Sequence, residues 1–106
     1  MNQFDVHRTL GSRRQAAPFL VVVQSRRLAV LATRVVIPLI PQRVGEFERD
    51  LAPPIEFEGR VFRLAPWQIF AIPVTALGPV VASLADDTDA APIIRAIDAL
   101  ISQTWR

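Results

Sequence analysis

Short runs of hydrophobic residues, separated by polar connections, predict β-strands along most of the chain. Residues 3–9 alternate between apolar and polar side chains, which predicts a first strand. The β-branched runs at 19–24 and 34–40 predict two buried strands. Pro38 lies inside the second run, and it indicates an edge position or a bulge because proline cannot donate a hydrogen bond to a sheet.

A hairpin is predicted after a polar stretch at 41–50. Residues 54–57 and 60–64 are separated by Glu58 and Gly59, and Gly59 supplies the turn conformation. Residues 67–74 predict one more strand, ended or bent by a proline. Five or six short strands with tight connections indicate an antiparallel sheet or a small barrel.

The pattern changes to a helical period near the end of the chain. Thr88 or Asp89 can cap a helix over 90–106, with nearby acids at its positive end. One face of this helix carries Ile93, Ile97, Leu100 and Thr104. We therefore expect a mostly β single domain, with a barrel over about 1–85 and a helix over about 89–105 that packs on the sheet.

Composition and charge narrow the class of partner. Of the 106 residues, 51% are hydrophobic, which excludes a disordered tail. The net charge of +2 hides a charge of +6 in residues 1–43 and of −4 in residues 44–106. All twelve basic residues are arginine, and the doublets at 13–14 and 26–27 have no interleaved aromatic side chains. Sequence-specific nucleic-acid binding is therefore not expected, and an acidic peptide or simple solvation accounts for the basic half.

The residues that carry chemistry are sparse. Cysteine is absent, and His7 is the only histidine; we expect it at the surface. No phosphate-binding glycine loop is present, so binding is favoured over catalysis, and neither a metal nor a cofactor is expected. The apolar stretch at 64–85 contains three prolines, which argues against a membrane-spanning helix. We expect a soluble, cytoplasmic protein.

Several short motifs are spread along almost the whole chain in a fixed order. They are Gln3-Phe-Asp-Val6, Val23-Gln-Ser25, Val36-Ile-Pro-Leu39, Leu51-Ala-Pro53, Phe62-Arg63, Ile72-Pro-Val74 and Ala96-Ile-Asp-Ala-Leu-Ile101. In this order the chain resembles the CcdB family of toxins from toxin–antitoxin modules. The resemblance implies a small SH3-like antiparallel barrel, similar to CcdB and MazF, that forms a homodimer. It also implies a toxin that binds the A subunit of DNA gyrase and traps the gyrase–DNA cleavage complex, and that a CcdA-like antitoxin neutralises.

The resemblance also assigns binding residues by position. The gyrase-binding residues it implies are Arg27, Leu28, Asp98, Ile101, Ser102, Gln103, Thr104 and Trp105. The antitoxin-binding residues, in or near the loops at 9–17 and 41–48, are Arg8, Arg13, Arg14, Arg43 and Glu46. The family's Gly-Ile ending is missing here, and Arg27 replaces an aliphatic residue. Trp105 is either an interface anchor or packs on its own barrel.

Two other functions remain open. The first is a MazF-like endoribonuclease, for which Arg60 and Arg63 with Glu56 or Glu58 could supply acid, base and phosphate-binding groups. The second is a diverged homologue that has lost the poison or acts on another target. A second subunit could also cover part of residues 21–23, Phe70 and the helix stripe.

Overall fold

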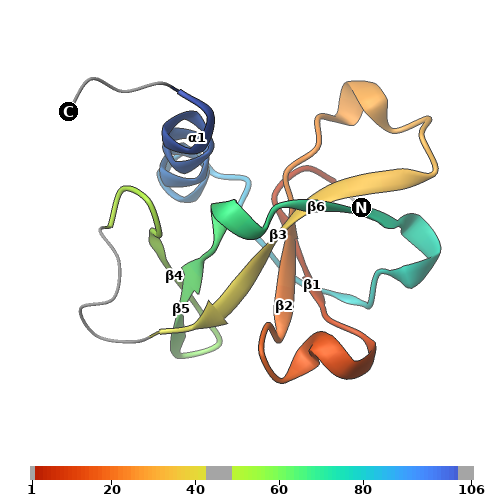
Figure 1. The fold of residues 1–106 in the computed structure, drawn as a ribbon, viewed down its shortest axis with the longest axis horizontal. Helices are drawn as coiled ribbons and strands as arrows, with labels where there is room; N and C mark the ends of the chain where they lie inside the picture. Colours follow the sequence, from red (N-terminus) through yellow and green to blue (C-terminus); the bar gives the residue numbers. More distant parts are fainter. Residues whose placement is uncertain (1, 43–48, 103–106) are drawn as a thin grey trace.

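The computed structural model describes residues 2–42 and 49–102, apart from the side chain of Arg13. Figure 1 shows β-strands arranged around a central β3, with the α-helix α1, which spans Asp87–Ile101, beside them. The strands are β1 Asp5–Arg8, β2 Phe19–Val22, β3 Thr33–Pro41, β4 Pro54–Phe57, β5 Arg60–Leu64, β6 Phe70–Pro73 and β7 Val80–Ser83. Short 3-10 helices lie between them: η1 Gly11–Arg14, η2 Arg26–Leu28, η3 Pro66–Gln68 and η4 Val74–Ala76.

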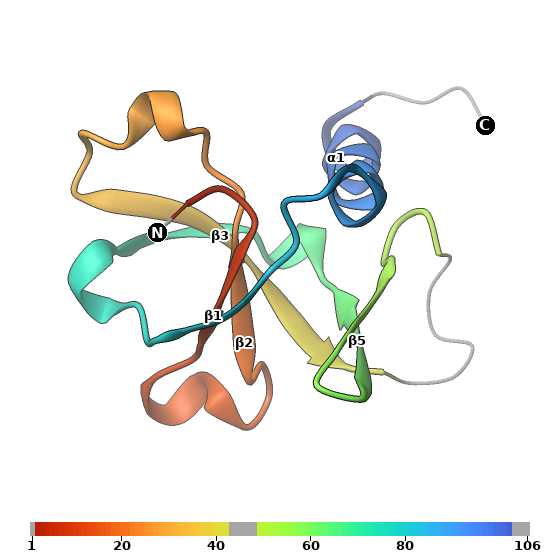
Figure 2. The ribbon, with the colours of Figure 1, turned by 180° about the vertical axis from the view of Figure 1, so that it is seen from behind.

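The strands form one antiparallel sheet in the order β4-β5-β3-β2-β1-β7, with β6 paired to β3. β2 lies between β1 and β3, with Val21 opposite Val6 on one side and Ile37 on the other. The sheet curls into a half-barrel, and β4 and β7 form its two open ends (Figure 2). The expected antiparallel β fold with a C-terminal helix is confirmed.

Pro38 was predicted to mark an edge position or a bulge, but β3 is an interior strand of the sheet. Residues 33–36 of β3 pair with β6, and residues 39–41 pair with β5. Pro38 falls between these two stretches, so its missing N–H leaves no gap in either ladder. An interior strand can therefore carry a proline where its partner on one side changes.

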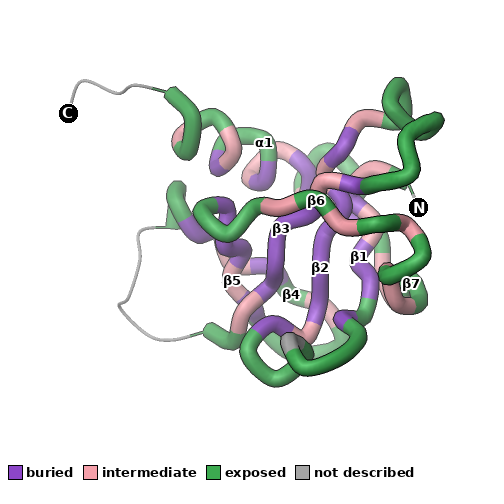
Figure 3. The backbone as a smooth tube through the Cα atoms, turned by 45° about the vertical axis from the view of Figure 1, so that its right-hand side comes forward, coloured by how far each residue is buried: buried purple, intermediate pink, exposed green. Residues whose placement is uncertain are grey.

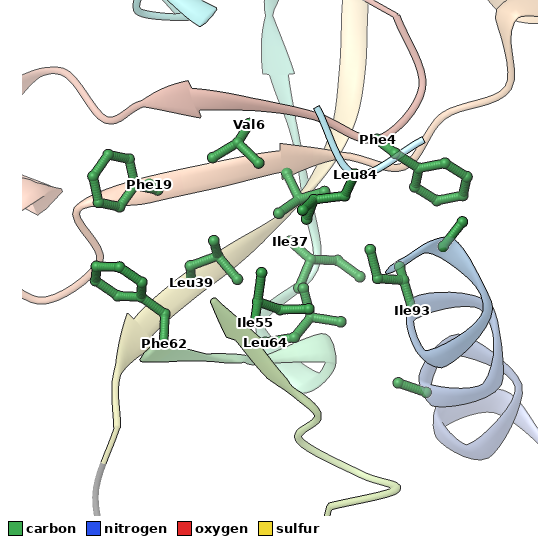
Figure 4. Packing of buried hydrophobic residues seen from close by; sticks show 13 residues of the cluster. Phe4, Val6, Phe19, Ile37, Leu39, Ile55, Phe62, Leu64, Leu84 and Ile93 are labelled. Atoms are coloured by element: carbon green, nitrogen blue, oxygen red, sulfur yellow. The ribbon is translucent and has the colours of Figure 1, made fainter. Parts of the chain in front are cut away.

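The main core lies between the concave face of the sheet and α1 (Figure 4). Ile93 points from α1 toward the sheet and is fully buried, which contributes about 1.5–3 kcal/mol. Phe19 makes edge-to-face contacts with Phe57 and Phe62, with ring centroids 4.7 and 5.2 Å apart. These aromatic contacts connect the β4–β5 hairpin to β2.

The helix begins earlier than the sequence pattern indicated. Asp86, rather than Thr88 or Asp89, is the N-cap, and its Oδ1 accepts a hydrogen bond from the amide of Asp89 at 2.9 Å. Pro92 therefore lies in the second helical turn, where it cannot donate to the carbonyl oxygen of Thr88. The helix ends at Ile101, because Ser102 adopts an extended conformation.

A second apolar cluster lies on the other face of the sheet. Leu20, Val22 and Val36 are buried there under Phe70, Ile72 and Leu77. Figure 3 shows that β2 is buried along its length because both of its faces are covered. The residues 21 and 22 are fully buried within one chain, so the expectation that a second subunit could cover them is wrong. Val23 and Phe70 are only partly buried.

Three features between residues 58 and 83 refine the predicted pattern. Glu58 and Gly59 both have positive φ angles, 53° and 72°, as a two-residue type I′ hairpin turn requires. The predicted strand at 67–74 divides into η3 and the shorter β6. The strand β7 was not predicted at all, and it completes the sheet beside β1.

Candidate functional site

An open groove of about 840 Å³ lies on the face of the sheet opposite α1. One wall is the β1–β2 loop, residues 9–18, and the other is β6 with η4. Leu20 of β2 and Pro38 of β3 form its floor. Its walls include Thr9, Leu10, Phe70 and Ile72. A groove of this size and apolar character can accept a small molecule or a segment of another chain.

The groove carries hydrogen-bonding groups but no charge. Among the described residues that line it, none is titratable, and the polar side chains are Thr9, Ser12 and Gln68. Thr9 is 5% exposed, and its Oγ1 atom has no hydrogen-bond partner among the described residues. An unpaired buried hydroxyl is costly, and a bound donor or acceptor would relieve that cost. The groove is therefore suited to a neutral, mainly apolar occupant with one hydrogen-bonding group.

His7 is buried on β1 rather than exposed at the surface, so that prediction was wrong. Its side chain is 2% exposed, and Nδ1 donates to the carbonyl oxygen of Gly78 at 2.8 Å. The cause is long range: the segment that follows η4 covers this face of β1. The Nε2 atom of His7 is buried and, like Thr9 Oγ1, has no partner among the described residues.

The structure does not gather the predicted antitoxin-binding residues into one site. Arg14 is exposed on η1, in the loop that forms one wall of the groove, and Arg13 belongs to the same short helix. Arg8 is exposed on β1, and its guanidinium lies 5.5 Å from the ring centroid of Phe19, a residue of the main core. Arg8 therefore faces away from the groove. Arg43 and Glu46 lie outside the described residues.

The predicted gyrase-binding residues fall on two separate surfaces. Arg27 and Leu28 belong to η2, and both are exposed. Asp98, Ile101 and Ser102 are exposed at the C-terminal end of α1. Figures 1 and 2 show η2 and that end of α1 on opposite sides of the molecule. Gln103, Thr104 and Trp105 lie outside the described residues. One chain alone therefore presents the two surfaces apart.

Two large apolar side chains are exposed along α1, with the exposed Asp98 between them. Ile101 is 73% exposed and Ile94, two turns earlier, is 51% exposed. The amide of Ser102 donates to the carbonyl oxygen of Asp98 at 2.7 Å, which closes the last helical turn. Side chains of this size at a helix end are typical of contact surfaces.

The four residues considered for ribonuclease chemistry are spread over the β4–β5 hairpin. The guanidinium of Arg60 lies 4.9 Å from the ring centroid of Phe62, and Arg63 Nε donates to the carbonyl oxygen of Ala52. Glu56 is exposed on β4, and Glu58 is exposed in the turn. None of the four lines the groove. Within residues 2–42 and 49–102, no group of three or more metal-ligating side chains occurs, and no helix is long and apolar enough to cross a membrane.

Sequence reasoning missed the groove and one exposed loop. The groove depends on β6 and η4 folding over the face of β2 and β3, a long-range contact that no motif indicates. The loop contains Val30 and Leu31, which are 91% and 48% exposed. The sequence did contain a sign of this exposed apolar loop. The stretch around Val30 and Leu31 is apolar and contains no proline or glycine, and yet it lies outside every predicted strand.

The fold is that of a curled antiparallel half-barrel with a C-terminal helix. The sequence profile of the family described as CcdB protein matches residues 3–102, so the chain belongs to the CcdB family. A search of individual curated proteins finds no match.

Two solved structures share the fold. An endoribonuclease in complex with its cognate antitoxin, from a mycobacterial species, superimposes with a TM-score of 0.78 at 14% identity, and the match covers 100% of this chain and 99% of that one. The Mycobacterium tuberculosis toxin MazF-mt6 gives a TM-score of 0.72 at 14% identity, covering 95% of this chain and 99% of that one.

Proposed function

We propose that this protein is the toxin of a toxin–antitoxin module and that it acts by binding the A subunit of DNA gyrase rather than by catalysis. Membership of the CcdB family supports this proposal. The observation that carries it is the exposure of Ile101, 73%, at the C-terminal end of α1, where the family resemblance implies contact with gyrase. A large apolar side chain that is held out by a closed helix end is suited to enter a cavity of another protein.

A homodimer belongs to the same proposal. The two surfaces implied in gyrase binding lie apart in one chain, and a second copy adds a second pair of them. Ile94 is 51% exposed on α1, and Trp67 is 40% exposed on η3, the 3-10 helix that contacts α1. Covering such apolar side chains is a common reason for small domains to pair. Sedimentation equilibrium tests this part: a monomer at micromolar concentration would contradict it.

We assign the groove to the antitoxin. A solved structure of the same fold is a toxin in complex with its cognate antitoxin. The lining is apolar, and Arg14 is exposed on the loop that forms one wall. An antitoxin segment that combines apolar side chains with flanking carboxylates fits this arrangement, since arginine pairs well with carboxylates. Ordering of a disordered segment in the groove would couple its folding to binding.

An endoribonuclease is the second candidate, because one of the two solved structures that share the fold is an endoribonuclease and the other is the toxin MazF-mt6. General acid–base cleavage of RNA needs titratable groups within hydrogen-bond reach of one phosphate. The groove offers no such group among its described lining residues. Arg60 and Arg63 contact a ring and a backbone carbonyl instead. Binding is therefore the better-supported mode of action.

Deletion of residues 102–106 tests the assignment of the gyrase-binding end. We expect induction of the full chain to stop bacterial growth and the truncated chain to be harmless, because part of the proposed contact surface is removed. The truncated chain should still bind the antitoxin, because the groove lies on the opposite face. Growth arrest by the truncated chain would place the toxic surface elsewhere.

A further inference from the structure

The β2–β3 loop, residues 23–32, is held by two buried polar side chains. Gln24 is 8% exposed; its Nε2 donates to the carbonyl oxygens of Leu28 and Thr33 at 3.2 Å, and its Oε1 accepts from the amide of Val35 at 3.0 Å. These bonds reach the backbone in the middle of the loop, at Leu28, and the first residues of β3, at Thr33 and Val35. Gln24 thus ties the start and the middle of the loop to the first residues of β3.

Arg34 holds the outer part of the same loop. It is 8% exposed, and its Nη1 donates to the carbonyl oxygens of Leu31 and Thr33 at 2.6 and 2.8 Å. Its Nη2 donates to the carbonyl oxygen of Ala29 at 3.1 Å. Burying a guanidinium costs free energy unless its N–H groups are hydrogen-bonded. Here they donate to backbone carbonyls in this loop and at its junction with β3. The planar fork of arginine reaches several carbonyls at once, which a lysine cannot do.

The backbone of the loop is ordered by turns as well. The amides of Leu28, Ala29 and Leu31 donate to the carbonyl oxygens of residues 25, 26 and 28, each at 3.0 Å. The carbonyls of residues 28, 29 and 31 accept hydrogen bonds from the side chain of Gln24 or Arg34, and the apolar side chains at the tip of the loop are exposed. Leu28, Val30 and Leu31 are 49%, 91% and 48% exposed. An irregular loop with this many fixed carbonyls is more rigid than its lack of regular structure would indicate.

We propose that Gln24 and Arg34 are positioning residues that preorganise the β2–β3 loop as an apolar docking element, with Val30 and Leu31 as contact residues beside Leu28. The proposal rests on the proposed function and deepens it by adding contact residues and the groups that position them. The partner is the toxin's protein target, at an apolar hollow with an acidic rim. Charge complementarity supports that choice, since the exposed Arg26 and Arg27 lie next to the apolar tip.

Preorganisation gives the two positioning residues a function beyond closing a loop. A flexible loop must be ordered when the partner binds, and that ordering reduces the affinity. A loop that is already held in the contact geometry avoids this loss. The three outward apolar side chains then bind without further rearrangement of the backbone.

The contact residues are tested with Val30→Asp and Leu31→Asp. Val30 projects into solvent, so Val30→Asp should leave the melting temperature unchanged, and Leu31 is half exposed, so Leu31→Asp should lower it only slightly. In both variants a carboxylate at an apolar contact beside an acidic rim repels the partner. We expect the protein level that halves the growth rate of induced cells to rise at least about tenfold. Leu51→Asp is the matched control, because Leu51 is 42% exposed and lies outside every surface proposed here. Full toxicity of both loop variants would overturn the proposal, whereas a harmless wild-type chain would instead refute the proposed function.

The positioning role is tested with Gln24→Leu, Arg34→Met and Arg34→Lys. We expect amide hydrogen exchange in residues 25–33 to accelerate in the first two variants while β1 and β2 stay protected, and toxicity to fall together with the loss of protection. Arg34→Lys keeps the charge and one donor group, so it should restore both only in part. If folded Arg34→Met shows unchanged amide hydrogen exchange in the loop, the positioning role is overturned. This result does not depend on whether the proposed target is correct.

Discussion

The imidazole of His7 donates a hydrogen bond from Nδ1 to the carbonyl oxygen of Gly78 at 2.8 Å, and it thereby joins β1 to the segment that leads into β7. A carbonyl oxygen only accepts hydrogen bonds, so Nδ1 carries the proton. The approach is possible because residue 78 has no side chain: a Cβ atom there would overlap the carbonyl oxygen of Arg8. One side of the sheet thus depends on a glycine and a histidine 71 residues apart.

Substitution of this glycine should destabilise the fold. We expect Gly78→Ala to lower the free energy of unfolding by about 1–3 kcal/mol, because the added methyl group forces the segment away from β1. Urea denaturation measures the change. Gly11→Asn is the control: Gly11 has a positive φ of 79° and open space around it, and asparagine tolerates that conformation, so its cost should stay below about 1 kcal/mol. Equal effects of the two substitutions would refute the steric explanation.

The hydrogen bond itself can be separated from the volume of the ring. In His7→Asn the side-chain amide can replace the Nδ1 donor, whereas in His7→Gln it lies one bond too far from Gly78. We therefore expect His7→Gln to be less stable than His7→Asn by about 1 kcal/mol. Thermal unfolding followed by circular dichroism gives the comparison. Glutamine is closer to histidine in size, so the opposite order would show that volume, not the hydrogen bond, decides.

Removal of the Thr9 hydroxyl should affect stability and antitoxin binding in opposite directions. Thr9→Val removes a buried oxygen that has no partner, so the free protein should be as stable as the wild type or more stable by about 1 kcal/mol. If a bound antitoxin segment pairs with Oγ1, its affinity should fall about three- to tenfold. Titration calorimetry with a peptide of the antitoxin measures the affinity. Unchanged affinity would remove Oγ1 from the binding site.

Because of Asp89 in the first turn of α1, we expect the stability of the protein to depend on pH in the acidic range. Burial, then repulsion by Asp86 and a side-chain hydrogen bond with Asp86, raise the pKa of Asp89 above the ordinary value of 3.8. A raised pKa in the folded state means that the contribution of Asp89 to stability is present below the unfolded pKa and is lost as the pH rises through the folded pKa. Asp89→Asn cannot ionise, so its stability relative to the wild type should increase between about pH 3 and pH 6.

Asp87→Asn provides the matched control for this experiment. Asp87 lies in the same helical turn and is exposed, so its replacement removes the same charge from the same end of the helix. Denaturant unfolding at several pH values, with the two variants compared at each, isolates the combined effect of burial and of Asp86 on Asp89. If both variants show the same dependence on pH, the loss of one charge near the helix terminus accounts for it.

The sequence predicted the elements whose environment is local. The run from Phe19 to Val22 and the turn at Glu58 and Gly59 carry their own signals, and each lies where it was expected. The strand β7 was missed because Gly78 and Pro79 precede it and its residues do not alternate in polarity. β7 forms because β1 offers it a free edge, which is a property of the sheet and not of the segment.

The candidate site was less predictable for the same reason. His7 has polar neighbours in the sequence, and its burial is decided by a segment 71 residues away. Arg34 interrupts an apolar stretch, yet it is buried because it bonds to carbonyls of a loop that precedes it by three to five residues. Residues of this kind are placed by backbone geometry that only the folded chain defines.

We propose that this protein disables DNA gyrase by binding it and that it does not cut RNA. The most direct measurement incubates it with purified DNA gyrase and supercoiled plasmid, adds detergent and protease, and in parallel incubates it with RNA alone. We expect linear plasmid to appear only when gyrase and the protein are both present, and we expect the RNA to stay intact. Plasmid that remains uncut together with RNA that is cleaved would contradict it and establish the endoribonuclease instead.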